Sequence, residues 1–483
     1  GIPRGSPVKD MAERVILAKA PRQLCPRDGR PGCAYVDALA GEDSAGHATH
    51  MLSYTWGYDV LAIVNTLTSY CDDRKLTDSR TYFWICCLCI NQWRVKESIE
   101  SKEVISCEHF QQEFRSRVEG IGHVVAMLTP WDSPHYLKRV WTLFEFYTAI
   151  ELGPEQCSLD IVMPEEDVAN LASHAFNKDI MDQVYKAMAS AKVEDAQASV
   201  QADRDNILEM IRLGEGCEKM ERRIAEHLQR FFVAELDTYG TRNMDAVKTE
   251  DAILYLLHVG RLHRRSGQAG RTEELLALAR RRLEEAGLAL SPVGAKVFRS
   301  IGQHRTATQD YKGGLEAYDE AAHVFRELGE LRSHDYAELL DFVGDARRKA
   351  GDHAGALQAL EEARAIYVEN GEGETKEFAF LLNNIGDLLR DRGEPAASRA
   401  AMEEALRIYG LHGMLGSTDC ARLQVSLGWL HCEGGEPVAA ERLFKAARET
   451  LELGCMMESD QGQRLLKGLE RVRELRAVDL PAP

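Results

Sequence analysis

The pattern of apolar and polar positions across residues 123–152 predicts a strand, a turn and a helix in succession. The short apolar run Val124–Leu128 is typical of a strand that is buried on both faces. Residues Thr129–Pro134 contain Pro, Asp and Ser side chains, which favour a turn. Ser133 suits the N-cap of the following helix and Pro134 suits its first turn, so we expect the helix to begin there.

The predicted helix carries a carboxylate among large apolar side chains. Its apolar residues recur at i, i+3 and i+4 spacing and should face the sheet: Val140, Leu143, Phe144, Tyr147 and Ile150. Glu145 falls in the adjoining stripe, together with Trp141 and Thr148. That stripe should lie near the end of the sheet where ligands usually bind in open α/β folds. Glu145 is therefore the first candidate for a functional side chain.

Three more stretches have strand patterns, and helical patterns lie between them. Strands are predicted over Thr49–Trp56, Tyr82–Ile90 and Ser158–Met163, and helices over Asp59–Cys71 and over Ser98–Val118, which has Ser98 as its N-cap. Strands that alternate with helices indicate a parallel sheet covered on both faces. The fold class predicted for this part of the chain is α/β.

Residues on either side of this domain differ from it in composition. Residues 1–45 form a turn-rich lead-in, and the α/β domain is assigned to 46–165. Residues 166–245 are predicted to be a helical connecting region, with helices over Asn170–Ala191, Arg204–Leu213 and Lys219–Leu236. The region either completes the α/β domain or couples it to the next part of the chain, and the sequence leaves both possibilities open.

The C-terminal half contains five copies of one unit. An aliphatic residue followed by glycine recurs every 42 residues, at Val259-Gly260, Ile301-Gly302, Val343-Gly344, Ile385-Gly386 and Leu427-Gly428. Further glycines follow at Gly267, Gly351, Gly393 and Gly435, where the second copy has Gln309, and at Gly287, Gly329, Gly371, Gly413 and Gly454. Each unit is predicted to be two helices joined by a short turn, and the units should stack into an all-α solenoid over 246–460. A capping helix and tail are assigned to 461–483.

Composition limits the classes of partner. The 483 residues carry a net charge of −18 with a pI of about 5.4, which argues against general affinity for nucleic acid or anionic membrane. The sequence has no apolar run of membrane-spanning length and no signal-peptide pattern, so we expect a cytoplasmic protein that binds neither. The 12 cysteines are irregularly spaced, which favours reduced thiols. Cys86, Cys87 and Cys89 lack a matching second pair, which favours buried structural thiols over a metal site.

Three motifs in the α/β domain carry a resemblance to a known family. They are S-Y-T-W-G at Ser53–Gly57, W-I-C-C-L-C-I-N-Q at Trp84–Gln92 and R-V-W-T-L-F-E at Arg139–Glu145. These blocks resemble the signature blocks of fungal heterokaryon-incompatibility (HET) domains, which belong to the wider group similar to Toll/interleukin-receptor (TIR) domains. The resemblance covers about 47–165 and implies a TIR/flavodoxin-like parallel sheet. Cys86 stands where the HET pattern usually has Asp, so any role of that Asp is lost or moved in this chain.

This resemblance implies an enzymatic activity. Catalytic TIR domains cleave NAD at the nicotinamide–ribose bond and use a helix-borne glutamate, whose position Glu145 matches. A carboxylate there can stabilise an oxocarbenium-like ribose or orient a ribose hydroxyl. NAD would be the substrate, and neither a cofactor nor a metal is implied. The residues expected to contact the substrate are Ser53, Tyr54, Trp56, Trp131 and Trp141.

Structural roles are the alternative for these residues. Glu145 could pair with Arg139 or Lys138 or reach solvent, and Trp141 could belong to the core. Many TIR-like domains only self-associate, so a non-enzymatic signalling scaffold is a second hypothesis. A different base- or nucleotide-cleaving activity at the same carboxylate is a third.

The repeats resemble tetratricopeptide (TPR) repeats in the longer form found in kinesin light chains. This second resemblance implies a protein or peptide partner on the solenoid. The two together predict an NAD glycohydrolase effector of immune or cell-death signalling that is regulated or assembled through its solenoid. We expect the active form to be a homo-oligomer.

Overall fold

The computed structural model describes residues 5–17, 23–39, 44–76, 80–101, 107–175, 192–453, 457 and 459–478. The chain divides into two compact units, Gly1–Glu235 and Leu236–Pro483, and each is described by itself. The first is the α/β unit and the second is the repeat array, so the predicted fold class is confirmed.

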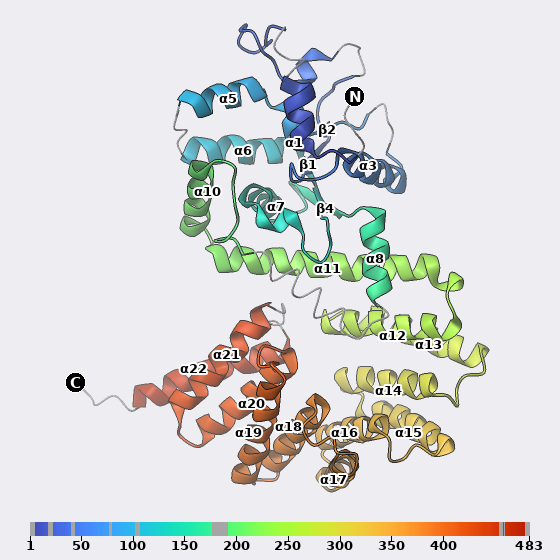
Figure 1. Ribbon diagram of the computed structural model, residues 1–483. Helices are drawn as coiled ribbons and strands as arrows, with labels where there is room; N and C mark the ends of the chain where they lie inside the picture. Colours follow the sequence, from blue (N-terminus) through green and yellow to red (C-terminus); the bar gives the residue numbers. More distant parts are fainter. Residues whose placement is uncertain are drawn as a thin grey trace. The chain divides into compact units, whose positions relative to one another are not determined.

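Four parallel strands form the sheet of the α/β unit (Figure 1). They are β1 (His50–Ser53), β2 (Phe83–Trp84), β3 (His123–Met127) and β4 (Ser158–Val162), and their order across the sheet is β2-β1-β3-β4. In the register of the sheet Ser53 lies opposite Ala126, and Met127 opposite Val162. Strand β1 is fully buried and β3 is buried from Val124 to Met127, as their apolar patterns predict.

Helices cover both faces of the sheet. On one face α3 (Val60–Arg74) brings Tyr70, whose hydroxyl donates to Asp160 on β4 at 2.7 Å. On the other face lie α6 (Cys107–Ile121) and α7 (Val140–Leu152), which contact each other and the strands. Residues of a strand point alternately to the two faces, so the strand register places Asp160 on the α3 face and Ser53 on the α7 face.

Part of the connecting region packs against helix α7 of the α/β unit. Helices α10 (Gln201–Leu213) and α11 (Cys217–Asn243) supply partners for the outer side of α7. The Tyr147 hydroxyl donates to Glu215 at 2.6 Å, and Arg223 donates to the carbonyl of Ile150 at 3.2 Å. Helix α7 is therefore buried on nearly all sides, which explains why Phe146, outside the predicted sheet-facing stripe, is also buried.

Three local predictions are wrong, and the first concerns β2. The strand predicted over Tyr82–Ile90 ends at Trp84, and Cys86–Cys89 forms a helical turn, α4. A short apolar run fits a strand and a buried helical turn equally well, so the pattern could not separate them.

The start of α7 also differs from the prediction. Ser133 and Pro134 precede a short 3₁₀ helix, η4 (His135–Lys138), and α7 begins only at Val140. The Ser133 hydroxyl accepts from Lys138 at 2.8 Å instead of capping α7. Arg139 is extended because it forms a β-bridge with Gln197, and this bridge separates the two helices.

The other elements of this unit are short or lie at its edges. The predicted helix Ser98–Val118 is divided between α5 (Gln92–Ser101) and α6, so Ser98 lies inside α5 and is not an N-cap. Most of the predicted helix Asn170–Ala191 lies outside the described residues. The remaining elements are α1 (Val8–Met11), η1 (Ala12–Ile16), η3 (Val36–Ala38) and α8 (Glu165–Ala175).

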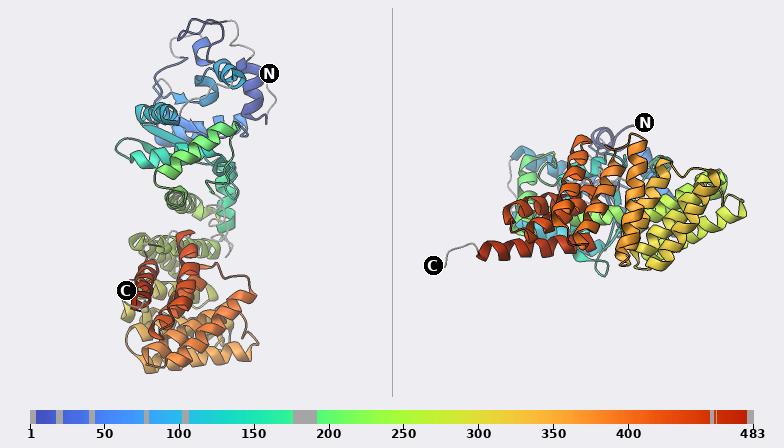
Figure 2. Two further views of the ribbon diagram at one scale, coloured as in Figure 1. Left: turned by 90° about the vertical axis from the view of Figure 1, so that its left-hand side faces the viewer. Right: turned by 90° about the horizontal axis from the view of Figure 1, so that it is seen from below.

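The repeat array consists of five helical hairpins that pack in chain order (Figure 2). A short 3₁₀ helix, η5 (Met244–Ala246), precedes them. The hairpins are α12 (Thr249–Arg265) with α13 (Ala269–Glu285), α14 (Pro292–Ala307) with α15 (Tyr311–Leu328), α16 (His334–Lys349) with α17 (His353–Glu369), α18 (Lys376–Asp391) with α19 (Pro395–Leu411), and α20 (Thr418–Glu433) with α21 (Pro437–Leu453). Helix α22 (Asp460–Val478) packs on the last hairpin and covers its apolar side, as a capping helix does. Gly454 lies outside the described residues.

The repeated glycines have two structural roles. Four of those in the first helices leave room for a large side chain of the second helix: an added Cβ would lie 2.4 Å from Tyr318 at Gly302, 2.5 Å from Leu360 at Gly344, 2.6 Å from Met402 at Gly386 and 2.6 Å from Phe444 at Gly428. The glycines between the helices, such as Gly351 with φ 85°, adopt left-handed backbone conformations. Gln309 adopts the same conformation, with φ 66°, although it has a side chain.

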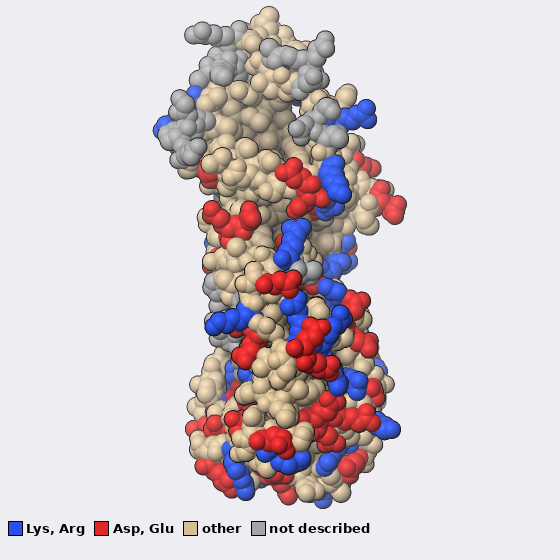
Figure 3. Space-filling view, turned by 90° about the vertical axis from the view of Figure 1, so that its right-hand side faces the viewer, with Lys and Arg blue, Asp and Glu red and all other residues tan. Residues whose placement is uncertain are grey.

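Charged side chains of both signs lie side by side over the array (Figure 3). Several pairs join neighbouring hairpins, for example Arg348 with Asp391 at 2.7 Å and Arg399 with Glu436 at 2.9 Å. Pairs that reach solvent, such as Arg399 with Glu436, contribute little stability each, so burial of apolar side chains accounts for most of it. Among the described residues, no helix combines the length and the apolar character needed to cross a bilayer.

Candidate functional site

The strand order creates a natural binding position between β1 and β3. The chain leaves β1 toward β2 on one side and returns to β3 on the other, so the connections diverge at this point. In open α/β sheets ligands bind at the carboxyl ends of the strands that flank such a switch point. Ser53 is the last residue of β1, and Glu145 lies on α7, the helix that follows β3. Both candidate residues are therefore at the position that the topology favours.

Glu145 and Ser53 are in direct contact. The Ser53 hydroxyl donates a hydrogen bond to the Glu145 carboxylate, and Ser53 itself is fully buried. Glu145 is half-buried. Burial raises the pKa of Glu145 to about 7, although the Ser53 hydrogen bond and the positive charge of Arg117 both act to lower it. The carboxyl group can therefore gain or lose a proton near neutral pH.

A second hydroxyl extends this contact inward. The Tyr136 hydroxyl lies 2.6 Å from the Ser53 hydroxyl oxygen, and the Tyr136 side chain is fully buried. Because Ser53 gives its single proton to Glu145, Tyr136 must be the donor to Ser53. Burial and the nearby charge of Glu145 hold the pKa of Tyr136 well above its ordinary value, so the phenol keeps its proton. The order of donation is Tyr136 to Ser53 to Glu145.

The first two sequence motifs supply a group of three further side chains, Tyr54, Trp56 and Cys86. The Trp56 indole N–H donates to the Cys86 sulfur at 3.3 Å, and the Cys86 thiol donates to the Tyr54 hydroxyl at 3.4 Å. Trp56 is 37% exposed, whereas Tyr54 is buried. The negative charge of Glu145 helps to raise the pKa of Cys86, to about 11, after the larger effect of burial. Glu145 is therefore close enough to Cys86 to act on its ionisation.

The other two expected substrate contacts have structural partners. Trp131 is buried, and its indole N–H donates to Asn170 at 2.8 Å. The ring of Trp141 packs at 6.1 Å from that of Phe114, and its indole is hydrogen-bonded to Asp203. These contacts lead away from the Ser53–Glu145 pair. The structure thus brings together Glu145, Ser53, Tyr54, Trp56 and Cys86, and gives Trp131 and Trp141 other surroundings.

The cysteines of α4 are protonated thiols. Burial raises the pKa of Cys87 to about 12, with Cys86 and Cys89 also shifted upward. A thiol binds metals and reacts as a nucleophile mainly as its thiolate, which such surroundings disfavour. In the part of the chain that the structure describes, no group of three or more His, Cys, Asp or Glu side chains is placed to hold a metal ion.

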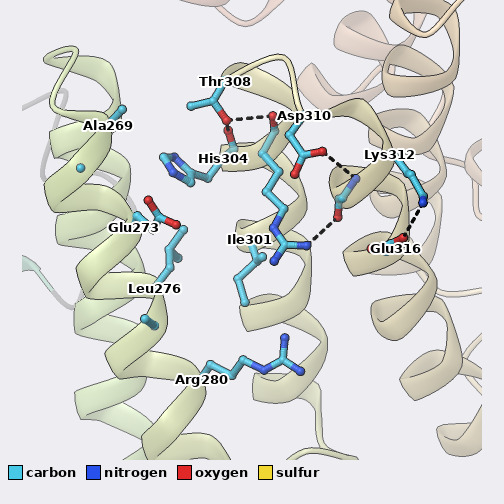
Figure 4. Close-up of a pocket in the computed structure, with 14 residues that line it drawn as sticks. Ala269, Glu273, Leu276, Arg280, Ile301, His304, Thr308, Asp310, Lys312 and Glu316 are labelled. Atoms are coloured by element: carbon cyan, nitrogen blue, oxygen red, sulfur yellow. Dashed lines mark hydrogen bonds and ion pairs between the residues drawn. The ribbon is translucent and has the colours of Figure 1, made fainter.

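The array contains a cavity of about 640 Å³ between α13, α14 and α15 (Figure 4). Glu273 and His304 point toward each other across it, and Leu276 and Ile301 form an apolar part of its wall. His304 is 7% exposed, and its Nδ1 atom has no hydrogen-bond partner among the described residues. The cavity belongs to the array alone and is separate from Glu145.

Comparisons with known proteins match the helical array. No family model matches the chain, and no curated protein matches it either. Solved structures do: BtubC (BKLC) from P. vanneervenii is 16% identical, with 53% of this chain and 93% of that chain covered and a TM-score of 0.34. A Podosopora anserina structure described as kinesin light chain TPR-like repeats is 13% identical, with 42% and 97% covered and a TM-score of 0.34.

A Rap protein complexed with competence and sporulation factor is also similar. It is 13% identical, with 65% of this chain and 87% of that chain covered and a TM-score of 0.42. The array of this chain is TPR-like because its paired helices repeat as hairpins that stack in chain order. The comparisons leave the α/β unit unidentified.

Proposed function

We propose that the α/β unit is a TIR-like NAD glycohydrolase in which Glu145 is the catalytic residue. The observation that carries this proposal is the half-buried carboxyl group of Glu145 at the switch point of the sheet. Its pKa is raised to about 7, and it accepts a hydrogen bond from Ser53. Perturbed carboxyl groups at such positions are typical of active sites. NAD as the substrate follows from the resemblance of the three motifs to HET and TIR domains.

In this proposal Glu145 acts as a carboxylate. The bond between the ribose C1′ and the nicotinamide nitrogen breaks, its electron pair leaves on the neutral nicotinamide, and positive charge develops on the ribose. Ionised Glu145 stabilises that charge, and water then adds to C1′ and loses a proton. Trp56, which is 37% exposed, offers an aromatic face for a nucleotide base or nicotinamide. Trp131 and Trp141 support the fold in this view.

The test is NAD consumption by the purified full-length protein at high concentration. We expect release of nicotinamide by the wild type and none by Glu145→Gln. Glu151→Gln is the matched control, because Glu151 lies on the same helix but is exposed and paired with Arg115 at 2.7 Å. Equal turnover by the wild type and Glu145→Gln would refute the role of Glu145.

A silent wild type requires a second experiment, because activity in the proposed homo-oligomer depends on association. The protein is then fused to an inducible dimerisation module, and the assay is repeated with Glu145→Gln in parallel. Activity only on clustering supports an effector assembled through its array. Absence of activity in both states favours the non-enzymatic scaffold, for which Cys86 in place of the usual Asp is the specific observation.

We propose further that the array binds a protein or peptide. Buried polar groups of α18 and α20 lack hydrogen-bond partners within the described residues: both amide atoms of Asn383, Oε1 of Gln424 and Oγ of Ser426. Asn383 is only 1% exposed, so these unmade bonds are costly, and a peptide backbone could supply both donors and acceptors. The test uses peptides selected from a display library for binding to the wild type. These peptides should not bind the Asn383→Leu variant. They should still bind the control variant Lys312→Gln, because the Lys312 ammonium group is exposed. Peptides that bind both variants equally would contradict this site.

A further inference from the structure

Three arginines of the first repeat lie on one face of α12. Arg261, Arg264 and Arg265 are three and four positions apart, which places their side chains together. In the described part of the chain, Arg261 and Arg265 have neither an ion pair nor a hydrogen bond, and the buried Nε of Arg261 has no partner. The Arg264 guanidinium donates only to the side-chain oxygen of Gln303, at 3.3 and 3.4 Å. This cluster, the repeat-1 arginine cluster, contains no internal counter-charge.

Repeats 3 and 4 contain an acidic residue that repeat 1 lacks. In repeat 3, Asp345 pairs with Arg348 at 3.0 Å, and in repeat 4, Asp387 lies 3.5 Å from Arg390, in both cases three residues along the helix. The 42-residue period puts Arg264 at the position of these two arginines and Arg261 at the position of the two aspartates. Repeat 1 therefore has a base where repeats 3 and 4 have the neutralising acid.

The surroundings do not replace this acid. The carboxylates of Asp419 and Glu338 attract Arg261 from beyond ion-pair distance, and Glu338 already pairs with Arg299. Burial and the neighbouring arginines lower the pKa of Arg264 to about 10, whereas the paired Arg348 has a raised pKa. The end of a helix favours cations, but it gives no acceptor to a buried guanidinium nitrogen. Unpaired buried charge of this kind is strongly unfavourable unless a ligand neutralises it.

We propose that the repeat-1 arginine cluster binds a phosphate dianion. Guanidinium groups match the geometry of phosphate oxygens and bind them through paired hydrogen bonds. Of the two carboxylates that attract Arg261, Glu338 is paired with Arg299, and Asp419 has no ion pair among the described residues. Three guanidinium charges and the charge of Asp419 leave about two positive charges unmatched, which a dianion neutralises and a single carboxylate does not. The group can come from a small phosphate ester or from a phosphorylated residue of a partner. The inference rests on the array as a binding surface and is independent of NAD cleavage.

The test is calorimetric titration of the full-length protein with inorganic phosphate at pH 8 and constant ionic strength. Arg261→Asp recreates in repeat 1 the aspartate–arginine pair of repeats 3 and 4, so it should fold and weaken phosphate binding at least about tenfold. Arg264→Gln should weaken binding similarly. Arg407→Gln is the control, because Arg407 is exposed and paired with Glu404 and Glu374, and it should leave binding unchanged.

Two further probes distinguish the sources of the phosphate group. Glycerol 3-phosphate represents a small ester, and a phosphoserine tetrapeptide, compared with its serine counterpart, represents a modified partner. Whichever competes at least about tenfold better with inorganic phosphate identifies the source, and competition by both supports the site. The proposal is overturned if the wild type binds no phosphate at millimolar concentration. It is equally overturned if Arg261→Asp and Arg264→Gln bind phosphate as well as the wild type does. The same holds if the serine peptide competes with phosphate as strongly as the phosphoserine peptide does. Nicotinamide release by the same variants should be unchanged, so the two proposals can fail separately.

Discussion

Replacement of Glu145 by Gln should make the α/β unit more stable, by an amount that grows as the pH rises from about 4.5 to about 7. The folded protein holds Glu145 with a pKa of about 7, whereas the ordinary value is 4.5. A carboxyl group with a raised folded-state pKa contributes its full stability below the unfolded-state pKa, and that contribution is lost as the pH rises through the folded-state value. At about 1.36 kcal/mol per pKa unit, the loss is roughly 3 kcal/mol when ionisation is complete. Gln keeps the acceptor for Ser53 and never ionises.

The assay is urea denaturation of the full-length protein followed by tryptophan fluorescence at pH 5 and pH 8. Five of the six tryptophans lie in the α/β unit, so the signal reports mainly on that unit. We expect Glu145→Gln to exceed the wild type by roughly 3 kcal/mol at pH 8 and by about 1 kcal/mol at pH 5. Glu151→Gln should show no such pH-dependent gain, because its carboxylate is exposed.

A pH-independent difference between Glu145→Gln and the wild type would refute this reasoning. It would mean that Glu145 ionises as freely in the folded protein as in the unfolded chain, and the strongest physical argument for a catalytic carboxyl group would be lost. The experiment does not require the substrate, so it tests the environment of Glu145 separately from the activity.

The remaining predictions concern activity and the array. The rate of NAD cleavage should rise as the pH increases through about 7, since ionised Glu145 is the active form; a rate that falls over this range in a pH–rate profile would contradict that role. Gly344→Ala should destabilise the array by about 1–3 kcal/mol, because the added Cβ would lie 2.5 Å from Leu360. The measurement is urea denaturation followed by circular dichroism. Gly373→Ala is the control and should be neutral, because there is open space around Gly373. Gln309→Gly should stabilise the array by about 1 kcal/mol in the same assay by relieving a left-handed backbone, and a loss of stability would show that the Gln309 side chain contributes more than the strain costs.

The repeats and the sheet were predictable because each depends on a periodic pattern. Five aliphatic–glycine pairs at one spacing are best explained by one recurring hairpin, and the apolar patterns of β1, β3 and β4 are those of strands that pair within a sheet. The run Tyr82–Ile90 failed because apolar character alone does not distinguish a strand from a buried helical turn. The break between η4 and α7 depends on Gln197, which lies far from it in the sequence.

The candidate site was predictable only where a motif named its residues. Tyr136 gave no sequence signal, because its contact with Ser53 spans 83 positions and depends on the short helix η4. The surroundings of Trp131 and Trp141 come from Asn170 and Asp203, which lie outside the three motif blocks. The contacts of this site that could not be predicted from the sequence are mostly made with side chains from distant segments of the chain.

The close contact between helices within each hairpin has a consequence for how the array can change. The glycine on the first helix is constant, but the residue that covers it varies from Tyr318 to Leu360 to Met402 to Phe444. The size of this one residue sets how far apart the two helices stand, and small rotations from each hairpin add up along a solenoid. Curvature could therefore be altered during evolution, or by design, through single substitutions at these positions, with the loops and the contacts between hairpins left as they are.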